Sequence, residues 1–123
     1  MSAKVIMHVE DNEYNRKIVR DLLSKGNYEL VEVRDGEAAL AELARCRPDL
    51  ILMDVQLPKL SGLDVTRRIR SDPALSEIPI IALTSFALSG DDRRALDAGC
   101  NAYIAKPFRP RELLEMITRL VGT

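Results

Sequence analysis

Short apolar runs alternate with amphipathic segments along the whole chain. Five runs have the length and composition of buried strands, and they fall at 5–9, 30–33, 50–54, 80–84 and 102–105. Apolar residues recur at helical spacing in five further segments, marked by Ile18 and Val19, Leu40 and Leu43, Val65 and Ile69, Ala95, Leu96 and Ala98, and Leu113 and Ile117. Strands that alternate with helices favour a parallel sheet covered by helices on both faces, the doubly wound α/β architecture.

Polar residues mark where these helices begin. Asp11 or Asn12 can cap the first helical segment, 13–25, and Asp35 can cap the second, because short polar side chains accept hydrogen bonds from free backbone N–H groups. The fourth segment follows Ser89, which has the spacing of a capping box. That segment has few apolar residues, so its helix should be the least firmly packed.

The composition fits one globular domain over residues 1–123. There are 18 Lys and Arg against 19 Asp and Glu, so the charge alone suggests neither a nucleic-acid nor a membrane partner. The apolar runs are far shorter than the roughly 18 residues of a membrane span, and no N-terminal targeting segment is evident. We therefore expect a cytoplasmic protein, in which Cys46 and Cys100 are reduced and have no assigned function.

Reactive side chains stand at the ends of four of the five expected strands. Glu10 and Asp11 follow the first strand, Asp54 ends the third, Thr84 the fourth, and Lys106 follows the fifth. Open parallel sheets bind ligands at the carboxyl ends of their strands, and these ends all lie at one edge. Asp54 is the first candidate for chemistry, because a carboxylate that ends an apolar strand is costly unless it is paired or bound to a cation.

This set of residues suits a magnesium-dependent phosphoryl transfer. Clustered carboxylates repel one another unless a cation shares the site, and an all-oxygen ligand set is typical of Mg²⁺. Lys106 can neutralise a transferring phosphoryl group, the Thr84 hydroxyl can bind one of its oxygens, and Asp54 can act as the nucleophile. The sequence has no glycine-rich phosphate loop, so the phosphoryl donor must bring its own binding surface.

A family resemblance rests on four stretches, which are Val9-Glu10-Asp11-Asn12, Leu52-Met53-Asp54-Val55-Gln56-Leu57-Pro58 with Ser61-Gly62, Leu83-Thr84-Ser85, and Ala105-Lys106-Pro107. With these stretches, the sequence over residues 4–121 resembles the CheY-like receiver domain of two-component response regulators. The resemblance implies a flavodoxin-like (βα)5 sandwich with five parallel strands in the order 2-1-3-4-5. Around residues 10–15 the sequence is also similar to single-domain cell-cycle regulators and to the receivers of hybrid sensor kinases.

The resemblance implies how the phosphoryl group and the metal are bound. Asp54 would be the phosphoacceptor, and the donor would be a phosphohistidine on a sensor histidine kinase or a histidine phosphotransfer protein. Asp11 would bind Mg²⁺ directly, Glu10 would bind it through a water, and Asp54 and the backbone carbonyl of Gln56 would complete the protein ligands. Lys106 would contact the phosphoryl group.

The resemblance also implies a switch, formed by Thr84, Ser85, Tyr103, Lys106 and Pro107. A cis bond would join Lys106 to Pro107, Thr84 would move toward the phosphoryl oxygens, and Tyr103 would turn inward in the active state. Phosphorylation would shift a two-state equilibrium, and the face made by the fourth helix, the fifth strand and the fifth helix would bind a downstream protein.

The implied function is that of a single-domain response regulator, which signals through phosphorylation-controlled protein binding, in cell-cycle or cell-division control. Such a protein is not an enzyme, apart from promoting its own phosphorylation and dephosphorylation. The printed sequence ends two residues after Val121, so we expect no output domain, although a receiver cut from a longer chain would have the same sequence.

Two other classes of protein remain open. A magnesium-dependent phosphohydrolase also forms an aspartyl phosphate, but it typically needs a second acid two positions after the nucleophile, where this chain has Gln56. A scaffold that works without phosphorylation would need none of these groups. Taken singly, Tyr103 could be a core aromatic and Lys106-Pro107 a solvated turn.

Two positions depart from the family's usual pattern. Glu10 stands where aspartate is more common, and its extra methylene is tolerable for a ligand that acts through water. His8 replaces the usual aliphatic residue, and with a rise of about 3.3 Å per residue its Cα should lie about 10 Å from that of Asp11, inside the sheet. We expect His8 to be a core histidine with satisfied hydrogen bonds, neither a phosphodonor nor a metal ligand.

Overall fold

The computed structural model of the protein describes residues 3–85 and 91–121. In this part of the chain, five parallel strands form one sheet in the order β2-β1-β3-β4-β5, which confirms the expected strand order. The strands are β1 (Lys4–Val9), β2 (Tyr28–Val33), β3 (Leu50–Asp54), β4 (Ile80–Thr84) and β5 (Ala102–Ala105). The helices are α1 (Glu13–Leu23), α2 (Gly36–Leu43), α3 (Gly62–Ser71), α4 (Asp91–Ala98) and α5 (Pro110–Val121).

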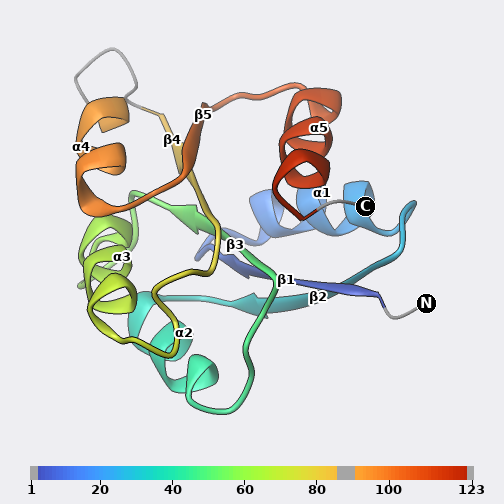
Figure 1. The fold of residues 1–123 in the computed structure, drawn as a ribbon. Helices are drawn as coiled ribbons and strands as arrows, with labels where there is room; N and C mark the ends of the chain where they lie inside the picture. Colours follow the sequence, from blue (N-terminus) through green and yellow to red (C-terminus); the bar gives the residue numbers. More distant parts are fainter. Residues whose placement is uncertain (1–2, 86–90, 122–123) are drawn as a thin grey trace.

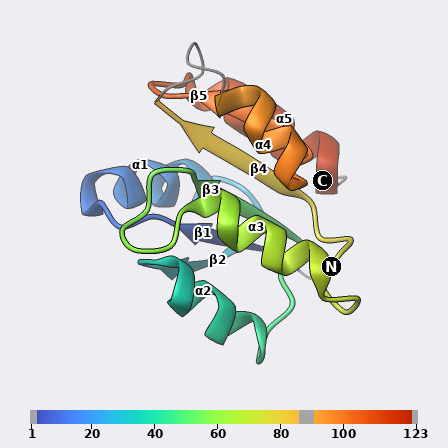
Figure 2. The same cartoon turned by 90° about the vertical axis from the view of Figure 1, so that its left-hand side faces the viewer.

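Helices cover both faces of the sheet, as Figures 1 and 2 show. Helices α1 and α5 pack on one face, and α2, α3 and α4 pack on the other. All of β3 is buried, and its side chains alternate between the two cores. Leu50 and Leu52 face α1 and α5, whereas Ile51 and Met53 face the other three helices. The three-layer architecture therefore follows from strands that are apolar on both sides.

Side-chain caps fix where three helices begin. Asn12, and not Asp11, caps α1 by accepting a hydrogen bond from the Asn15 N–H at 3.0 Å. Asp35 caps α2 as expected, and Ser61 caps α3. The expected capping residue Ser89 lies outside the described residues. Because Asn12 performs the capping, Asp11 remains available to the site.

Two expectations about the helices need correction. Helix α1 ends at Leu23, with Ser24 as its C-cap, and so stops short of residue 25. In α4, Ala95 and Ala98 are buried, but the Leu96 side chain is 47% exposed, so Leu96 is not the buried contact that was expected. At helical spacing Leu96 falls on the side of α4 that faces away from the sheet, because one residue corresponds to about 100° of rotation.

Parallel hydrogen bonding continues one residue beyond several strands and delivers the polar residues to one edge of the sheet. The Glu10 N–H donates to the Val33 carbonyl at 3.0 Å, and the Lys106 N–H donates to the Thr84 carbonyl at 2.7 Å. Asp54 is itself the last residue of β3. The ends of β1, β3 and β5 are therefore held in register with one another.

None of the helices formed by the described residues has the length and apolar composition needed to cross a membrane.

Candidate functional site

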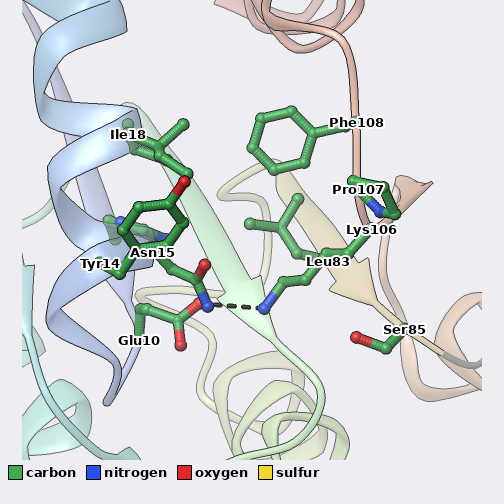
Figure 3. A pocket seen from close by; sticks show the side chains of 11 residues that line it. Glu10, Tyr14, Asn15, Ile18, Leu83, Ser85, Lys106, Pro107 and Phe108 are labelled. Atoms are coloured by element: carbon green, nitrogen blue, oxygen red, sulfur yellow. Dashed lines mark hydrogen bonds and ion pairs between the residues drawn. The ribbon is translucent and has the colours of Figure 1, made fainter.

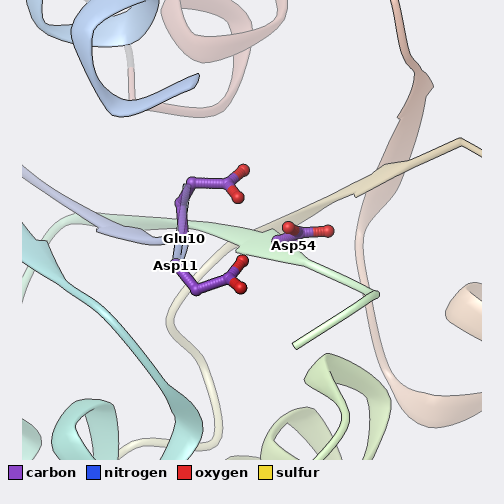
Figure 4. A group of neighbouring side chains, drawn as sticks. All are labelled: Glu10, Asp11 and Asp54. Carbon is purple, nitrogen blue, oxygen red and sulfur yellow. The ribbon is translucent and has the colours of Figure 1, made fainter. Parts of the chain in front are cut away.

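Three carboxyl groups meet at the carboxyl edge of the sheet. Glu10 and Asp11 follow β1 and Asp54 ends β3, and one oxygen from each lies within 4.8 Å of the others. Figure 4 shows the three side chains turned toward a common space. Glu10 and Asp54 are buried, whereas Asp11 is exposed and leaves the site open to solvent. An all-oxygen set of this kind fits a hard divalent cation such as Mg²⁺, which takes carboxylates and waters together.

A single ammonium group contacts both buried acids. Lys106 Nζ lies 3.0 Å from Glu10 Oε1 and 3.3 Å from Asp54 Oδ2. In Figure 3 the side chain reaches from the end of β5 toward Glu10, and a dashed line marks the contact. The amino group therefore neutralises part of the charge of the acids and lies beside the oxygen of Asp54 that could act as a nucleophile.

The remaining oxygens of the buried acids accept backbone hydrogen bonds. Asp54 Oδ1 accepts from the Gln56 N–H at 3.0 Å, and Glu10 Oε2 accepts from the Asn12 N–H at 3.3 Å. Each carboxyl group thus has one oxygen held by a loop N–H and the other directed at Lys106. These contacts fix the orientation of both side chains before any ligand binds.

The environment separates the pKa values of the two buried acids. Burial raises the pKa of Asp54 to about 7, with a further contribution from its hydrogen bond with Glu10 and against the opposing effect of Lys106. Burial would also raise the pKa of Glu10, but the hydrogen bond from Asp54 and the charge of Lys106 outweigh it and lower that pKa. Without metal and below about pH 7, Asp54 therefore favours its protonated form and Glu10 its ionised form, and a divalent cation would favour the ionised form of both.

Two polar residues, Thr84 and Ser85, lie at the end of β4, and Gln56 lies in the loop after β3. Thr84 is buried, and the Ser85 N–H lies 3.4 Å from Gln56 Oε1. The Gln56 side chain therefore connects the loop after β3 to the end of β4. The bond between Lys106 and Pro107 is cis, which confirms that expectation.

Tyr103 does not lie among the buried residues of the site. It lies in the edge strand β5, opposite Ala82 of β4, and its side chain is 37% exposed. In this conformation the ring faces outward. Its expected inward turn concerns a different conformation and stays a prediction.

A cavity of about 410 Å³ opens beside the acids, between α1 and the segment that connects β5 to α5. Tyr14 and Ile18 of α1 face Phe108 across it, and Glu10 and Lys106 lie at its base (Figure 3). No role for Tyr14 or Phe108 was expected from the sequence. The sequence indicated their place at the site only through their position, because each lies two to four residues from an acid or the lysine.

Arg16 is a third residue at the site whose role was not expected from the sequence. Its side chain is buried, and Nη1 donates to the backbone carbonyl of Glu10 at 2.9 Å. A signal was present in the sequence, since Arg16 lies three and seven positions before the buried residues Val19 and Leu23. That spacing places Arg16 on the inward face of α1.

His8 lies in the sheet and outside the acid cluster, as expected, but its hydrogen bonding was predicted wrongly. The side chain is fully buried, and among the described residues neither ring nitrogen has a hydrogen-bond partner. In the sheet, His8 lies beside Glu32 of β2 and Leu52 of β3. The Glu32 carboxylate binds Arg20 at 3.0 Å, and Leu52 has no polar side-chain atom to offer. Burial lowers the pKa of His8 to about 4, so the ring is neutral.

The sequence matches a known protein family and several of its members. The model of the response regulator receiver domain matches residues 6–118. The polar-differentiation response regulator DivK of Brucella anthropi is 47% identical over 119 residues, which are 97% of each chain. DivK of Brucella ovis is 46% identical over 120 residues, or 98% of each chain.

Solved structures give the same result for the fold. The receiver domain of the sensor histidine kinase PA1611 from Pseudomonas aeruginosa has a TM-score of 0.91 and 41% identity, covering 99% of this chain and 100% of that one. That crystal structure has a magnesium ion coordinated in the active-site cleft. The chemotaxis response regulator CheY4 of Vibrio cholerae has a TM-score of 0.90 and 27% identity, covering 97% of this chain and 99% of that one.

Proposed function

Because this chain belongs to the response regulator receiver domain family, we propose that Asp54 accepts a phosphoryl group from a phosphohistidine in a magnesium-dependent reaction. The donor is a sensor histidine kinase or a histidine phosphotransfer protein. The observation that carries the proposal is the position of Asp54, buried at the sheet edge with two further acids and Lys106 around it. A buried carboxylate with this arrangement is suited to receive a phosphoryl group and poorly suited to a purely structural role.

Four residues hold the metal in this proposal. Asp11 and Asp54 would bind Mg²⁺ directly, Glu10 would bind it through a water, and Gln56 would contribute its backbone carbonyl. When bound, Mg²⁺ neutralises the carboxylates and the charge that develops on the phosphoryl oxygens. The clustered acid oxygens and the exposed position of Asp11 support this assignment.

The transfer itself is a substitution at phosphorus. A carboxylate oxygen of Asp54 forms a bond to phosphorus while the bond from phosphorus to the donor imidazole nitrogen breaks, and the bonding electrons return to that nitrogen. Lys106, whose Nζ lies 3.3 Å from Asp54 Oδ2, stays with the phosphoryl oxygens as they arrive. The product is an aspartyl phosphate on this chain and a free histidine on the donor.

Thr84, Ser85, Tyr103, Lys106 and Pro107 then convert the modification into a change of surface. The Thr84 hydroxyl moves to a phosphoryl oxygen, and Tyr103 turns from its exposed position into the space that this movement frees. The face formed by α4, β5 and α5 binds the downstream protein in the phosphorylated state. The outward position of Tyr103 supports this assignment, because it leaves the ring free to move inward.

The biological setting follows from the relatives. The DivK proteins are named for polar differentiation, and we assign this chain to the control of cell division or cell polarity as a single receiver domain over residues 1–123, acting in the cytoplasm. Its output is protein binding, with no direct contact to nucleic acid and no insertion into a membrane. The chemistry it catalyses is limited to its own phosphorylation and dephosphorylation.

Acetyl phosphate tests the proposal, since it supplies a phosphoryl group without a partner protein. Incubation with acetyl phosphate and Mg²⁺ should add one phosphoryl group to the intact protein, measured by mass spectrometry. The gain should disappear in Asp54→Asn and in the presence of EDTA. The control Asp21→Asn, which changes an exposed acid in α1, should behave as the wild type.

Three outcomes would contradict the proposal. Rapid turnover of acetyl phosphate with no stable mass gain would favour a phosphohydrolase, and the absence of any modification would favour a scaffold that works without phosphorylation. A mass gain that persists in Asp54→Asn would place the acceptor elsewhere.

A further inference from the structure

A buried guanidinium group lies directly behind the two acids that follow β1. The Arg16 side chain is only 6% exposed, and its Nη1 donates to the Glu10 carbonyl oxygen at 2.9 Å. That oxygen belongs to the peptide group that joins Glu10 to Asp11. A hydrogen bond to this peptide group therefore restrains both acids at once.

Other contacts hold the ends of the same segment but do not bind this peptide group. The Glu10 N–H is bound by Val33 on β2, and the Asn12 N–H by the Glu10 carboxylate. Rotation about the bonds that flank the peptide group would swing the Asp11 carboxylate away from Asp54. Among the contacts described, the bond from Arg16 is the side-chain contact that opposes this rotation.

Arg16 is itself held in place by a series of ion pairs across α1. Its Nη2 pairs with Glu13 Oε2, and the other oxygen of Glu13 lies 3.3 Å from Arg20 Nη2. Arg20 in turn pairs with Glu32 of β2 at 3.0 Å. The series connects the sheet to the Glu10 peptide group. Because Arg16 is already held in place, its side chain loses little conformational entropy when a ligand binds.

The position of Arg16 would ordinarily be occupied by an apolar residue. It shares the inward face of α1 with Val19 and Leu23, where burying a charge is expensive unless its hydrogen bonds are satisfied. A charged residue at such a position needs a reason beyond packing. Its contact with the Glu10 carbonyl supplies one, because that carbonyl lies between two acids of the cluster.

From these contacts we infer that Arg16 is a positioning residue for the divalent-cation site, acting through the peptide group between Glu10 and Asp11. The inference rests on the proposed function for the identity of the cation. Arg16 does not touch the ion or the phosphoryl group. It keeps the Asp11 carboxylate aligned with Asp54 before the cation arrives.

The substitution Arg16→Met tests this role, because Met has similar length and suits a buried helix face. The Kd for Mg²⁺, measured by NMR titration of the backbone amides of residues 9–12, should rise about tenfold or more, as expected when a residue that orients a metal ligand is lost. In the metal-free protein, hydrogen exchange at the Asp11 and Asn12 amides should accelerate. Arg16→Lys should restore only part of the affinity, since one ammonium cannot replace the two-pronged contact with Glu10 and Glu13.

Two matched variants separate positioning from general stability. Arg20→Met removes the next ion pair in the series without touching Glu10, and it should change the Kd for Mg²⁺ less than about threefold. Ile117→Val weakens the core beneath α1 and α5, far from the acids in sequence, and should leave the Kd unchanged while lowering stability.

The outcomes distinguish this inference from the proposed function. Arg16→Met with the Mg²⁺ affinity and amide exchange of the wild type would overturn the positioning role. An Ile117→Val variant with an equally weakened Mg²⁺ affinity would also overturn it, since loss of stability would then explain both results. A wild-type protein that takes up no Mg²⁺ would instead overturn the proposed function.

Discussion

Lys106 Nζ lies 3.0 Å from Glu10 Oε1, although the two residues are 96 positions apart in the sequence. The contact joins the ends of β5 and β1, which are separated in the sheet by β3 and β4. Lys106 spans this distance above the end of β3, and so it also reaches Asp54. The ammonium group thus links the outer strand, where Tyr103 lies, to the acids at the centre of the site.

Replacing Lys106 should destabilise the protein in the absence of metal. In Lys106→Met the buried Glu10 carboxylate loses its partner, and we expect the free energy of unfolding in urea with EDTA to fall by about 2 to 3 kcal/mol. Lys25→Met, an exposed change, should have little effect. Mg²⁺ should restore part of the stability of Lys106→Met, because the cation replaces the missing positive charge. A metal-free Lys106→Met protein as stable as the wild type would show that the ion pair does not balance the buried acid.

The fold and the acid cluster could be predicted because both depend on topology. Once 50–54 is recognised as a buried parallel strand, Asp54 must lie at its carboxyl edge, and the same rule applies to Glu10, Asp11 and Lys106. The spacing of these residues in the sequence does not itself predict that they lie close together. The sequence predicts strands that end at these residues, and the parallel arrangement of the strands brings the ends together.

Details that depend on competition between neighbouring side chains could not be predicted. Asp11 and Asn12 are both good caps, and the choice of Asn12 depends on which residue turns toward the acids. Arg16 stands at apolar spacing, but its burial depends on a carbonyl six residues before it. The pairing of Glu32 with Arg20 likewise depends on tertiary structure, and it leaves His8 without an acidic partner among the described residues.

A methyl group at Gly62 should disturb the phosphoacceptor directly. A Cβ at this position would lie 2.1 Å from the Asp54 carbonyl oxygen, a backbone atom that cannot move aside. We expect Gly62→Ala to lower the free energy of unfolding by about 2 to 3 kcal/mol and to slow phosphorylation by acetyl phosphate, despite the better helix propensity of Ala. Gly26→Ala, where the Cβ would meet the ring of Tyr28, should lose less than about 1 kcal/mol, since a side chain can shift. Equal losses in the two variants would argue against close packing of α3 beneath Asp54.

The raised pKa of Asp54 should make the stability of the metal-free protein fall as the pH rises. The folded protein keeps the Asp54 proton up to a pKa of about 7, whereas the unfolded chain loses it near 3.8. Between these values the native state binds more protons than the unfolded state, so this contribution is complete below about pH 4 and is lost through about pH 7. In EDTA, Asp54→Asn should therefore gain stability relative to the wild type on going from about pH 5 to about pH 8. Mg²⁺ should reverse the order at the higher pH, because it binds the ionised carboxylate. A difference between the two proteins that does not vary with pH would show that Asp54 is ionised throughout.

The buried His8 should destabilise the protein, and more so at low pH. Its ring nitrogens lack partners among the described residues, so His8→Leu should raise the free energy of unfolding at neutral pH by about 1 to 2 kcal/mol. In the folded protein, burial lowers the pKa of His8 from 6.5 to about 4. As the pH falls below 6.5, the histidine of the unfolded chain therefore binds a proton while the buried ring of the native protein stays neutral. The stability of the wild type should then decrease relative to that of His8→Leu over this range, measured by urea unfolding.

His8→Gln separates the two causes, because glutamine is polar but does not titrate. This variant should keep the cost of a buried polar group and lose the pH dependence that the histidine adds. A wild-type protein more stable than His8→Leu at neutral pH would mean that the ring has a compensating partner. If His8→Gln retained the full pH dependence of the wild type, the dependence would have to arise from the neighbouring acids, Glu10 and Asp54, whose pKa values are also displaced.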